Sequence, residues 1–232
     1  MIMGHRGADY YAKENTLKSI KLAMEQQADM IEIDVRQSWD NHLMLFHDNV
    51  LNWKTWGNGI FHTKTRDYLD GVRYIDGSRI PSLQQAMNML AKGDAKVCLD
   101  IKSLFIDIDN FYNVVAERKM LNRVNCTSFF QNVIRKYKDL NPKSDATLVA
   151  FFGTKKFVND AVDIGATHVS PFIISRNVVD YAHDNRLKVI SWPTLTRFQL
   201  ERNIRLGVDV ISTGRPDQTR LFLKNFASSL NC

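Results

Sequence analysis

The sequence has no long apolar run and no segment that reads as a membrane anchor. Lys, Arg, Asp or Glu interrupts every apolar stretch of the 232 residues before it reaches the ~20 residues that a membrane-spanning helix needs. This excludes a helical transmembrane protein, and we expect no stable membrane anchor. The first residues also lack a basic segment followed by an apolar one, so we expect no secretory signal and a cytoplasmic location.

Cysteine is scarce, and charge of either sign is dispersed. The three cysteines, Cys98, Cys126 and Cys232, lack the close spacing of a disulfide framework or a zinc site, which favours a reducing compartment. The 31 basic and 25 acidic side chains give a net charge of +6, but without a block of like charges. No compact basic stripe is interleaved with aromatics, so nucleic acid is not an expected partner, whereas phosphate-bearing small molecules fit the charge.

What the sequence does contain is a repeated alternation of short β-rich apolar runs with amphipathic stretches. The composition, 44% hydrophobic and 24% charged, is that of a globular protein, and no linker divides it, so we expect one domain over residues 1–232. The candidate strands are Met1–His5, Met30–Arg36, Ala95–Ile101, Val124–Phe129, Thr147–Phe151, His168–Pro171, Lys188–Trp192 and Val208–Ser212. These eight βα pairs predict an α/β fold, a (β/α)8 TIM barrel, with a doubly wound open sheet as the alternative.

Helix boundaries are legible from capping residues. Ser82 and Thr196 are each followed three residues later by Gln, the capping-box pattern that starts a helix. Gly207 stands where the helix after Thr196 would end in a left-handed residue. Asn15-Thr16 is expected to open an earlier helix of the barrel.

One irregularity follows the second candidate strand. Asp40-Asn41 divides Ile31–Arg36 from Leu43–His47, which predicts a hairpin that returns His47 beside that strand. Residues 49–80 then lack strong periodicity. A loop of this length in a compact domain is usually functional, so we expect an insertion that forms a lid or a binding loop.

Acidic side chains gather where the predicted strands end. The strand period of two points Glu32 and Asp34 to one face, and Asp100 follows on a neighbouring strand. Like charges at low dielectric are unfavourable unless one takes up a proton or a cation lies between them. Three carboxylates predict a hard-cation site of the Mg²⁺ or Ca²⁺ type. The alternative is that these acids pair with basic neighbours, namely Arg6, Arg36 and Lys102.

Two imidazoles flank this acidic cluster. His5 ends the first candidate strand and His47 ends the hairpin, and each could exchange protons near neutral pH. With Arg6 and Lys102 beside them, they form a constellation suited to phosphoryl transfer. Cations would hold the phosphate while one imidazole takes a proton and the other gives one.

Together these segments resemble the glycerophosphodiester phosphodiesterase family. The matching motifs follow the family's order from residue 4 to residue 217, and the N-terminal set is highly specific. They are Gly4-His5-Arg6-Gly7, Glu14-Asn15-Thr16, Ile31-Glu32-Ile33-Asp34-Val35, His47-Asp48, Ile80-Pro81-Ser82-Leu83, Leu99-Asp100-Ile101-Lys102, Ser191-Trp192, the run from Gly207 to Thr213, and Arg215-Pro216-Asp217.

The resemblance implies a barrel of this kind that hydrolyses small-molecule glycerophosphodiesters to an alcohol and glycerol 3-phosphate, with a divalent cation, Mg²⁺ or Ca²⁺. By matching position, His5 and His47 would be the acid–base pair, with His5 as the base and His47 as the acid. Residues 49–80 would correspond to the small insertion that covers the family's site. Either a substrate hydroxyl, through a cyclic intermediate, or water would attack the phosphorus.

The same matching assigns the remaining site residues. Three carboxylates would be the metal ligands: Glu32, Asp34 and Asp100. Three further side chains would contact the substrate, Arg6 and Lys102 at the phosphate and Trp192 on the glycerol or leaving-group side.

Three departures from the family's pattern make leaving-group preference non-transferable. Asp100 stands where Glu is usual and is shorter by one carbon, about 1.5 Å of reach. Pro193-Thr194-Leu195 replaces the common Thr-Val-Asn, and Gly214 stands where Asp is often found.

Two alternatives stay open. Asp100 also resembles the spider-venom-type phospholipases D, of sphingomyelinase D type, which act on choline-bearing lipids such as lysolipids. Those proteins are secreted and disulfide-bonded, and the cysteine pattern here argues against that branch. An inactive barrel that binds a phosphodiester or a protein partner would show damage to the acid–base pair or the acids, and the sequence shows neither. The head group and the oligomeric state are left undetermined.

Overall fold

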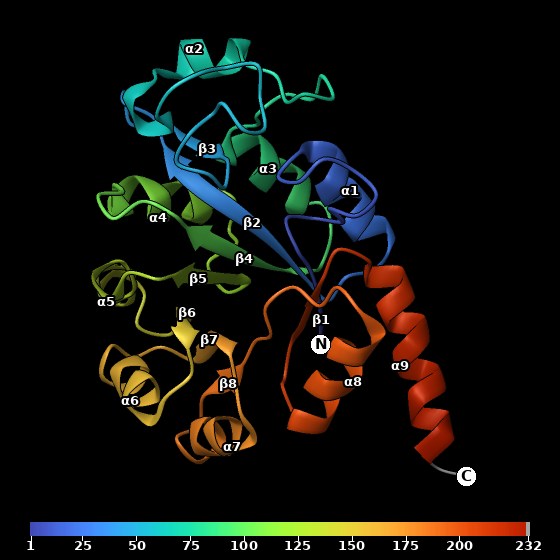
Figure 1. Cartoon of the computed structure of the whole chain (residues 1–232). Coiled ribbons are helices and arrows are strands. Elements are labelled where there is room, and N and C mark those ends of the chain that lie inside the picture. Colours follow the sequence, from blue (N-terminus) through green and yellow to red (C-terminus); the bar gives the residue numbers. More distant parts are fainter. Residues whose placement is uncertain (231–232) are drawn as a thin grey trace.

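The computed structural model describes residues 1–230, and its centre is a curled parallel sheet (Figure 1). Its parallel strands are β1 (Ile2–Gly4), β2 (Met30–Gln37), β4 (Lys96–Ile101), β5 (Val124–Ser128), β6 (Asp145–Phe152), β7 (His168–Ile173), β8 (Lys188–Val189) and β9 (Ile211–Thr213). They are hydrogen-bonded in the order β8-β7-β6-β5-β4-β2-β1-β9. A parallel bridge between Ile190 and Val210 joins the two ends of this path. The predicted (β/α)8 barrel is confirmed, and the open-sheet alternative is wrong.

Strand β3 (Leu43–Leu45) pairs antiparallel with β2 and forms the predicted hairpin with it. Val35 pairs with Leu45, and Asn41 in the turn has a left-handed φ of 63°, a conformation that Asn tolerates better than most residues. The hairpin places His47 two residues beyond β3, where the chain runs back alongside β2 next to Asp34. This returns the second imidazole to the acidic strand.

Helices surround the sheet and bury an apolar layer against it (Figure 1). They are α1 (Leu17–Glu25), α3 (Leu83–Leu90), α4 (Ile108–Ala116), α5 (Gln131–Leu140), α6 (Lys155–Asp163), α7 (Arg176–Asp184), α8 (Arg197–Leu206) and α9 (Pro216–Leu230). The capping boxes at Ser82 and Thr196 form as predicted, and Gly207 ends α8 with a left-handed φ of 78°. Within residues 1–230, no helix combines the length and apolar character needed to cross a membrane.

The start of α1 differs in one detail from the prediction. Thr16 is the N-cap, and its hydroxyl accepts from the Ser19 N–H, whereas Asn15 lies before the helix with a left-handed φ of 56°. The Asn15 side chain is instead buried in the site described below. Cys98 and Cys126 are buried free thiols, and Cys232 lies outside the described residues.

Residues 49–80 are more ordered than their weak periodicity predicted. They contain a 3₁₀ helix η1 (Phe61–Thr63) and the short helix α2 (Arg66–Gly71), and they lie beyond the β2/β3 hairpin (Figure 1). Phe61 stacks on Phe46 of the hairpin with ring centroids 5.2 Å apart, and Tyr74 lies 5.8 Å from the same ring. The insertion therefore has its own small core. Its apolar residues are too widely spaced to produce a helix or strand period.

Candidate active site

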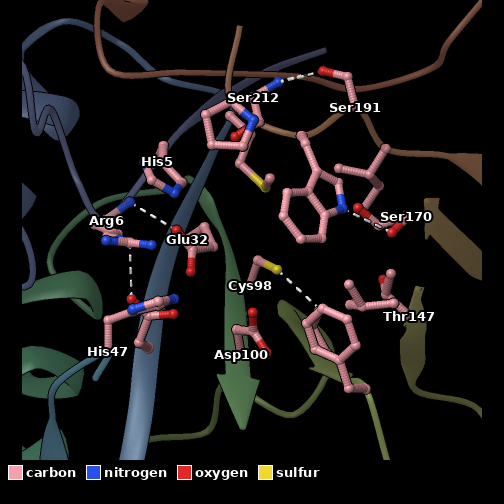
Figure 2. A pocket seen from close by; sticks show the side chains of 18 of the residues that line it. His5, Arg6, Glu32, His47, Cys98, Asp100, Thr147, Ser170, Ser191 and Ser212 are labelled. Atoms are coloured by element: carbon pink, nitrogen blue, oxygen red, sulfur yellow. Dashed lines mark hydrogen bonds and ion pairs between the residues drawn. The ribbon is translucent and has the colours of Figure 1, made fainter. Parts of the chain in front are cut away.

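A cavity of about 360 Å³ opens at the carboxyl ends of the strands. All eight residues that the sequence singled out as candidates line this cavity. They are His5, Arg6, Glu32, Asp34, His47, Asp100, Lys102 and Trp192. Figure 2 shows His5, Arg6, Glu32 and His47 along one side, with Thr147 and Ser170 across from them. Segments nearly 190 residues apart in the chain thus meet at one end of the barrel because parallel strands all end there.

Two neighbouring strands hold the acidic cluster in place. Glu32 and Asp34 project from β2, and Asp100 on β4 lies in register with Asp34. One carboxylate oxygen from each residue lies within 4.8 Å of the others, and all three side chains are buried. The alternation along β2 therefore acts as the sequence predicted, with Ile33 on the opposite face in the apolar core.

The three carboxyl groups differ in their affinity for protons. Burial raises the pKa of Glu32 well above its usual range, and the neighbouring charges of Asp34 and Asp100 raise it further. Burial also raises the pKa of Asp100, which Lys102 offsets only in part. Burial acts in the same direction on Asp34, but there the nearby charges of Lys102 and Arg6 outweigh it and hold the pKa well below the usual value.

Basic side chains only partly neutralise the cluster. Arg6 Nε lies 3.1 Å from Asp34 Oδ2, and Lys102 Nζ lies 3.1 Å from Asp34 Oδ1 and also bonds Asp100. Arg36 makes no such pair among the described residues and donates to the His47 carbonyl oxygen at 2.9 and 2.6 Å. Simple pairing of the acids with Arg6 and Lys102 is therefore found, and the expected pairing with Arg36 is wrong.

The donor set fits a hard cation. Three carboxyl groups face two basic side chains, so the fully ionised cluster would carry one negative charge more than Arg6 and Lys102 balance. Asp100 Oδ1 is buried and has no hydrogen-bond partner, which is unfavourable for an acceptor at low dielectric. An oxygen-binding cation beside Glu32 and Asp34 would satisfy that atom.

Both candidate imidazoles carry a carboxylate on the same ring nitrogen. His5 Nδ1 lies 2.6 Å from Asp9 Oδ2, and His47 Nδ1 lies 2.6 Å from Asp48 Oδ1. Each carboxylate accepts a hydrogen bond from a protonated Nδ1. The other ring nitrogen, Nε2, is therefore left to exchange a proton with a ligand in the cavity. Burial lowers the pKa of His47, and the positive charges of Arg6 and Lys102 add to this effect.

Two side chains that the sequence did not assign to the site support its acidic and basic groups. Asn15 is fully buried, donates from Nδ2 to Asp34 Oδ2 at 2.7 Å, and accepts from the Asp34 backbone N–H at 2.9 Å. Glu14 accepts from Arg6 Nη1 at 2.7 Å and from Lys54 Nζ at 2.6 Å. The Glu14-Asn15-Thr16 motif signals this site only as part of the family pattern, because nothing in its local spacing points to Asp34.

Lys54 is the contact between the insertion and the site. Besides Glu14, its Nζ pairs with Asp48 at 3.1 Å. No residue from 49–80 is among those that line the cavity in the described part of the chain. The insertion reaches the site through its charged neighbours.

The wall across from the acids is aromatic. Trp192 lies beside Phe172, Phe151 and Phe129 with ring centroids 4.9, 5.8 and 6.0 Å away. Its indole N–H donates to the Ser170 carbonyl oxygen at 3.0 Å, which fixes the ring plane. The cavity is therefore lined by charged side chains where β1, β2 and β4 end, and by aromatic rings and uncharged hydroxyl side chains where β5 to β8 end. A ligand with one anionic and one apolar or weakly polar end would match both walls.

Comparisons with known proteins agree with this geometry. The model of the family described as "Glycerophosphoryl diester phosphodiesterase family" matches residues 5–218. A glycerophosphodiester phosphodiesterase from Caldanaerobacter subterraneus subsp. tengcongensis is 29% identical over 230 residues, which cover 94% of this chain and 95% of that protein.

Solved structures share the fold. A glycerophosphodiester phosphodiesterase from Agrobacterium tumefaciens superimposes with a TM-score of 0.78 at 24% identity, covering 93% of this chain and 97% of that one. An Oleispira antarctica phosphodiesterase in complex with the product sn-glycerol-3-phosphate gives a TM-score of 0.90 at 19% identity, covering 97% and 96%. At these identities the likeness establishes the barrel.

Proposed function

The chain belongs to the glycerophosphoryl diester phosphodiesterase family, and from this premise we propose that it hydrolyses glycerophosphodiesters to an alcohol and glycerol 3-phosphate. The observation that carries the proposal is the convergence of three buried carboxylates, within 4.8 Å of one another, in a cavity that two imidazoles also line. The relatives named above are glycerophosphodiester phosphodiesterases, which supports the substrate class.

We assign the cation site to Glu32, Asp34 and Asp100. An all-oxygen set of this kind suits Mg²⁺ or Ca²⁺ better than a transition metal. When bound there, a cation would neutralise negative charge on the phosphate of the substrate. Asn15 and the paired backbone of β2 and β4 hold the carboxylates at a fixed separation, so little reorganisation is needed on binding.

We assign Arg6 and Lys102 to the phosphate of the substrate. Both side chains are largely buried, and each already faces carboxylates, Arg6 with Glu14 and Asp34 and Lys102 with Asp34 and Asp100. Burial lowers the pKa of Lys102, but Asp34 and Asp100 more than offset this, so the ammonium stays charged at neutral pH. An anionic phosphodiester would form ion pairs with these two cationic side chains.

The proton transfers fall to the two imidazoles. With His5 as base, its Nε2 takes the proton from the attacking oxygen as the new P–O bond forms. With His47 as acid, its Nε2 gives a proton to the leaving alcohol oxygen as the old P–O bond breaks. Without a ligand, the lowered pKa of His47 keeps it mostly neutral at pH 7. A bound phosphodiester anion beside it favours the protonated form that an acid requires.

The test is alcohol release from pure substrates. We expect the metal-loaded enzyme to release choline, ethanolamine or inositol from the matching glycerophosphodiesters with Mg²⁺ or Ca²⁺. A chelator should abolish this, and the His5→Ala variant is the matched control. Release no greater than that of the His5→Ala control would favour an inactive binding barrel. The phosphorus could be attacked by the glycerol 2-hydroxyl, through a cyclic intermediate, or directly by water. A substrate that lacks the 2-hydroxyl distinguishes these two routes, because only direct attack by water can cleave it.

A second candidate, hydrolysis of lysolipids, is favoured by the apolar half of the mouth. The loops after β4 and β8 and the last residues of β6 and β7 present exposed apolar side chains on this side of the mouth. These include Phe105, Phe152, Ile173 and Leu195. They could contact an acyl chain that remains attached to the glycerol. A preference for lysophosphatidylcholine over glycerophosphocholine under matched conditions would establish this candidate, and the reverse preference would exclude it.

A further inference from the structure

The carboxylate that bonds His5 comes from a position just after it in the chain. Asp9 lies four residues after His5, in the segment between β1 and α1, and its Oδ2 is 2.6 Å from His5 Nδ1. Both side chains are largely buried, with exposed fractions of 23% for Asp9 and 16% for His5. The pair is therefore shielded enough to hold one ring orientation.

A glycine on a distant segment leaves the room for this carboxylate. Gly214 follows β9, and a Cβ added there would lie 2.1 Å from Asp9 Oδ1 and 3.2 Å from the Tyr10 backbone nitrogen. The φ angle of Gly214 is not in the left-handed region, so backbone conformation does not require glycine at this position. The carboxylate of Asp9 is what excludes a side chain there.

We propose that Asp9 is a positioning residue for His5, and that Gly214 is required because Asp9 fills the space of its side chain. This inference rests on the proposed role of His5 in proton transfer. By accepting from Nδ1–H, Asp9 fixes the tautomer and directs the Nε2 lone pair into the cavity. It also stabilises the imidazolium that forms when His5 takes a proton.

The two segments have other contacts that do not touch His5. The Arg215 guanidinium lies 3.4 Å from the centroid of the Tyr10 ring, and the Tyr11 hydroxyl donates to Asp217 at 3.0 Å. The Tyr10 N–H also donates to the Gly214 carbonyl oxygen at 3.3 Å. Loss of the Asp9 carboxylate should therefore leave the segments packed together while it frees the imidazole.

A double-mutant cycle tests the shared space. We expect Asp9→Ala to lower kcat by about 10- to 100-fold with KM little changed, as loss of a carboxylate partner does for other functional imidazoles. Gly214→Ala should lower kcat to a similar degree because its methyl group displaces Asp9. The double variant should be no worse than either single one, since the displaced group is already gone. Losses that multiply in the double variant, or unchanged kcat in Asp9→Ala, would overturn the proposal.

Relocation of the carboxylate is the sharper test. In the Asp9→Ala background, Gly214→Asp returns a carboxylate to the same space from the other segment and should restore much of kcat. The matched control, Gly214→Asn in that background, fills the space without the negative charge and should restore far less. Equal recovery by Asp and Asn would show that Asp9 acts by packing alone and would refute the positioning role. Tyr11→Phe removes a contact between the same segments and should leave kcat unchanged.

A spectroscopic readout separates this proposal from the proposed function. In ¹⁵N spectra of the histidine side chains, the signals of His5 are identified as those that the His5→Gln variant lacks. In the Asp9→Ala variant, the chemical shifts of these signals should move away from those of the Nδ1–H tautomer. That change is expected whether or not the protein hydrolyses any substrate tried. An unchanged His5 signal would reject the positioning role independently of activity.

Discussion

At the scale of single residues, three carboxyl groups a few ångströms apart titrate over different ranges because each faces a different balance of burial and charge. Asp34 receives both basic side chains and an amide donor, whereas Glu32 receives a backbone N–H from Arg6 at 2.7 Å and no ion pair among the described residues. Asp34 is thus the fixed negative charge. Of the three, Glu32 and Asp100 are the groups that hold a proton most readily.

Cation binding should consequently depend on pH. Because the pKa values of Glu32 and Asp100 are raised, cation binding should release protons, and affinity should rise as pH increases through the raised pKa values of these carboxyl groups. Calorimetric titration with Mg²⁺ or Ca²⁺ at several pH values, in buffers of different ionisation enthalpy, measures both affinity and proton release. Asp34→Asn should weaken binding at every pH. Affinity that falls with rising pH, or no proton release, would contradict the assignment.

The two imidazoles should respond differently to the leaving group. We expect His5→Ala and His47→Ala each to lower turnover of glycerophosphocholine by at least about 10²-fold. With a p-nitrophenyl leaving group, which departs without a proton, only His47→Ala should recover, since its role as acid is bypassed. Steady-state rates on the two substrates decide the matter. Recovery of His5→Ala instead would exchange the two roles.

A buried histidine that does not line the cavity should contribute to acid sensitivity. His168 on β7 is buried, and burial lowers its pKa to about 4, so the folded protein binds its proton less readily than the unfolded chain. Its contribution to stability is present above the unfolded pKa of about 6.5 and is lost as pH falls toward 4, by up to about 3 kcal/mol. Urea unfolding at pH 7 and pH 5 should show a smaller loss for His168→Gln than for the natural chain. Equal losses would refute this.

At the residue scale, most of the site could be predicted from the sequence, but the residues that position its side chains could not. All eight candidate residues line one cavity, because strand ends and the period of two place side chains in ways that sequence can specify. Asp9 was not identified because its position depends on how the loop after His5 folds back. Gly214 was noted only because the family often has Asp at this position. The structure gives a physical reason for the glycine, since the Asp9 carboxylate occupies the space that a side chain at 214 would need.

At the scale of elements, the insertion is where sequence and structure differ most. Residues 49–80 fold on a few buried side chains, of which Phe61 and Tyr74 pack on Phe46 of the hairpin. Isolated apolar residues of this kind produce no period, whereas the barrel strands were recognisable because most of them are continuous apolar runs. The hairpin was predictable from its turn, since Asp40-Asn41 suits the left-handed φ of 63° at Asn41.

The insertion should therefore loosen as a unit when its core is cut. Phe61 is fully buried, and Phe61→Ala should destabilise its surroundings by about 3 to 5 kcal/mol. Hydrogen exchange should quicken across residues 49–80 while the amides of β5 to β7 stay protected. As a matched control, Trp56→Ala removes an exposed aromatic of the same insertion and should leave exchange unchanged. Uniformly faster exchange across the barrel would show that the insertion is not a separate cooperative unit.

At the scale of the whole molecule, the barrel brings residues that are far apart in the sequence to one cavity. His5 follows β1 and Trp192 follows β8, yet both line the same cavity because the sheet curls round and the Ile190 to Val210 bridge joins its two ends. The count of eight βα pairs predicted this closure. The apolar character of one half of the mouth was not foreseen, because exposure of loop side chains depends on the packing of neighbouring loops.

The central claim is that Glu32, Asp34 and Asp100 grip one divalent cation between the two imidazoles. Anomalous difference density from crystals grown with Mn²⁺ and glycerol 3-phosphate measures this directly. The account predicts a single strong peak within coordination distance of all three carboxylates, with the phosphate of the product bound to it and facing His5 and His47. A peak elsewhere, or density that excludes Asp100 from the ligands, would contradict it.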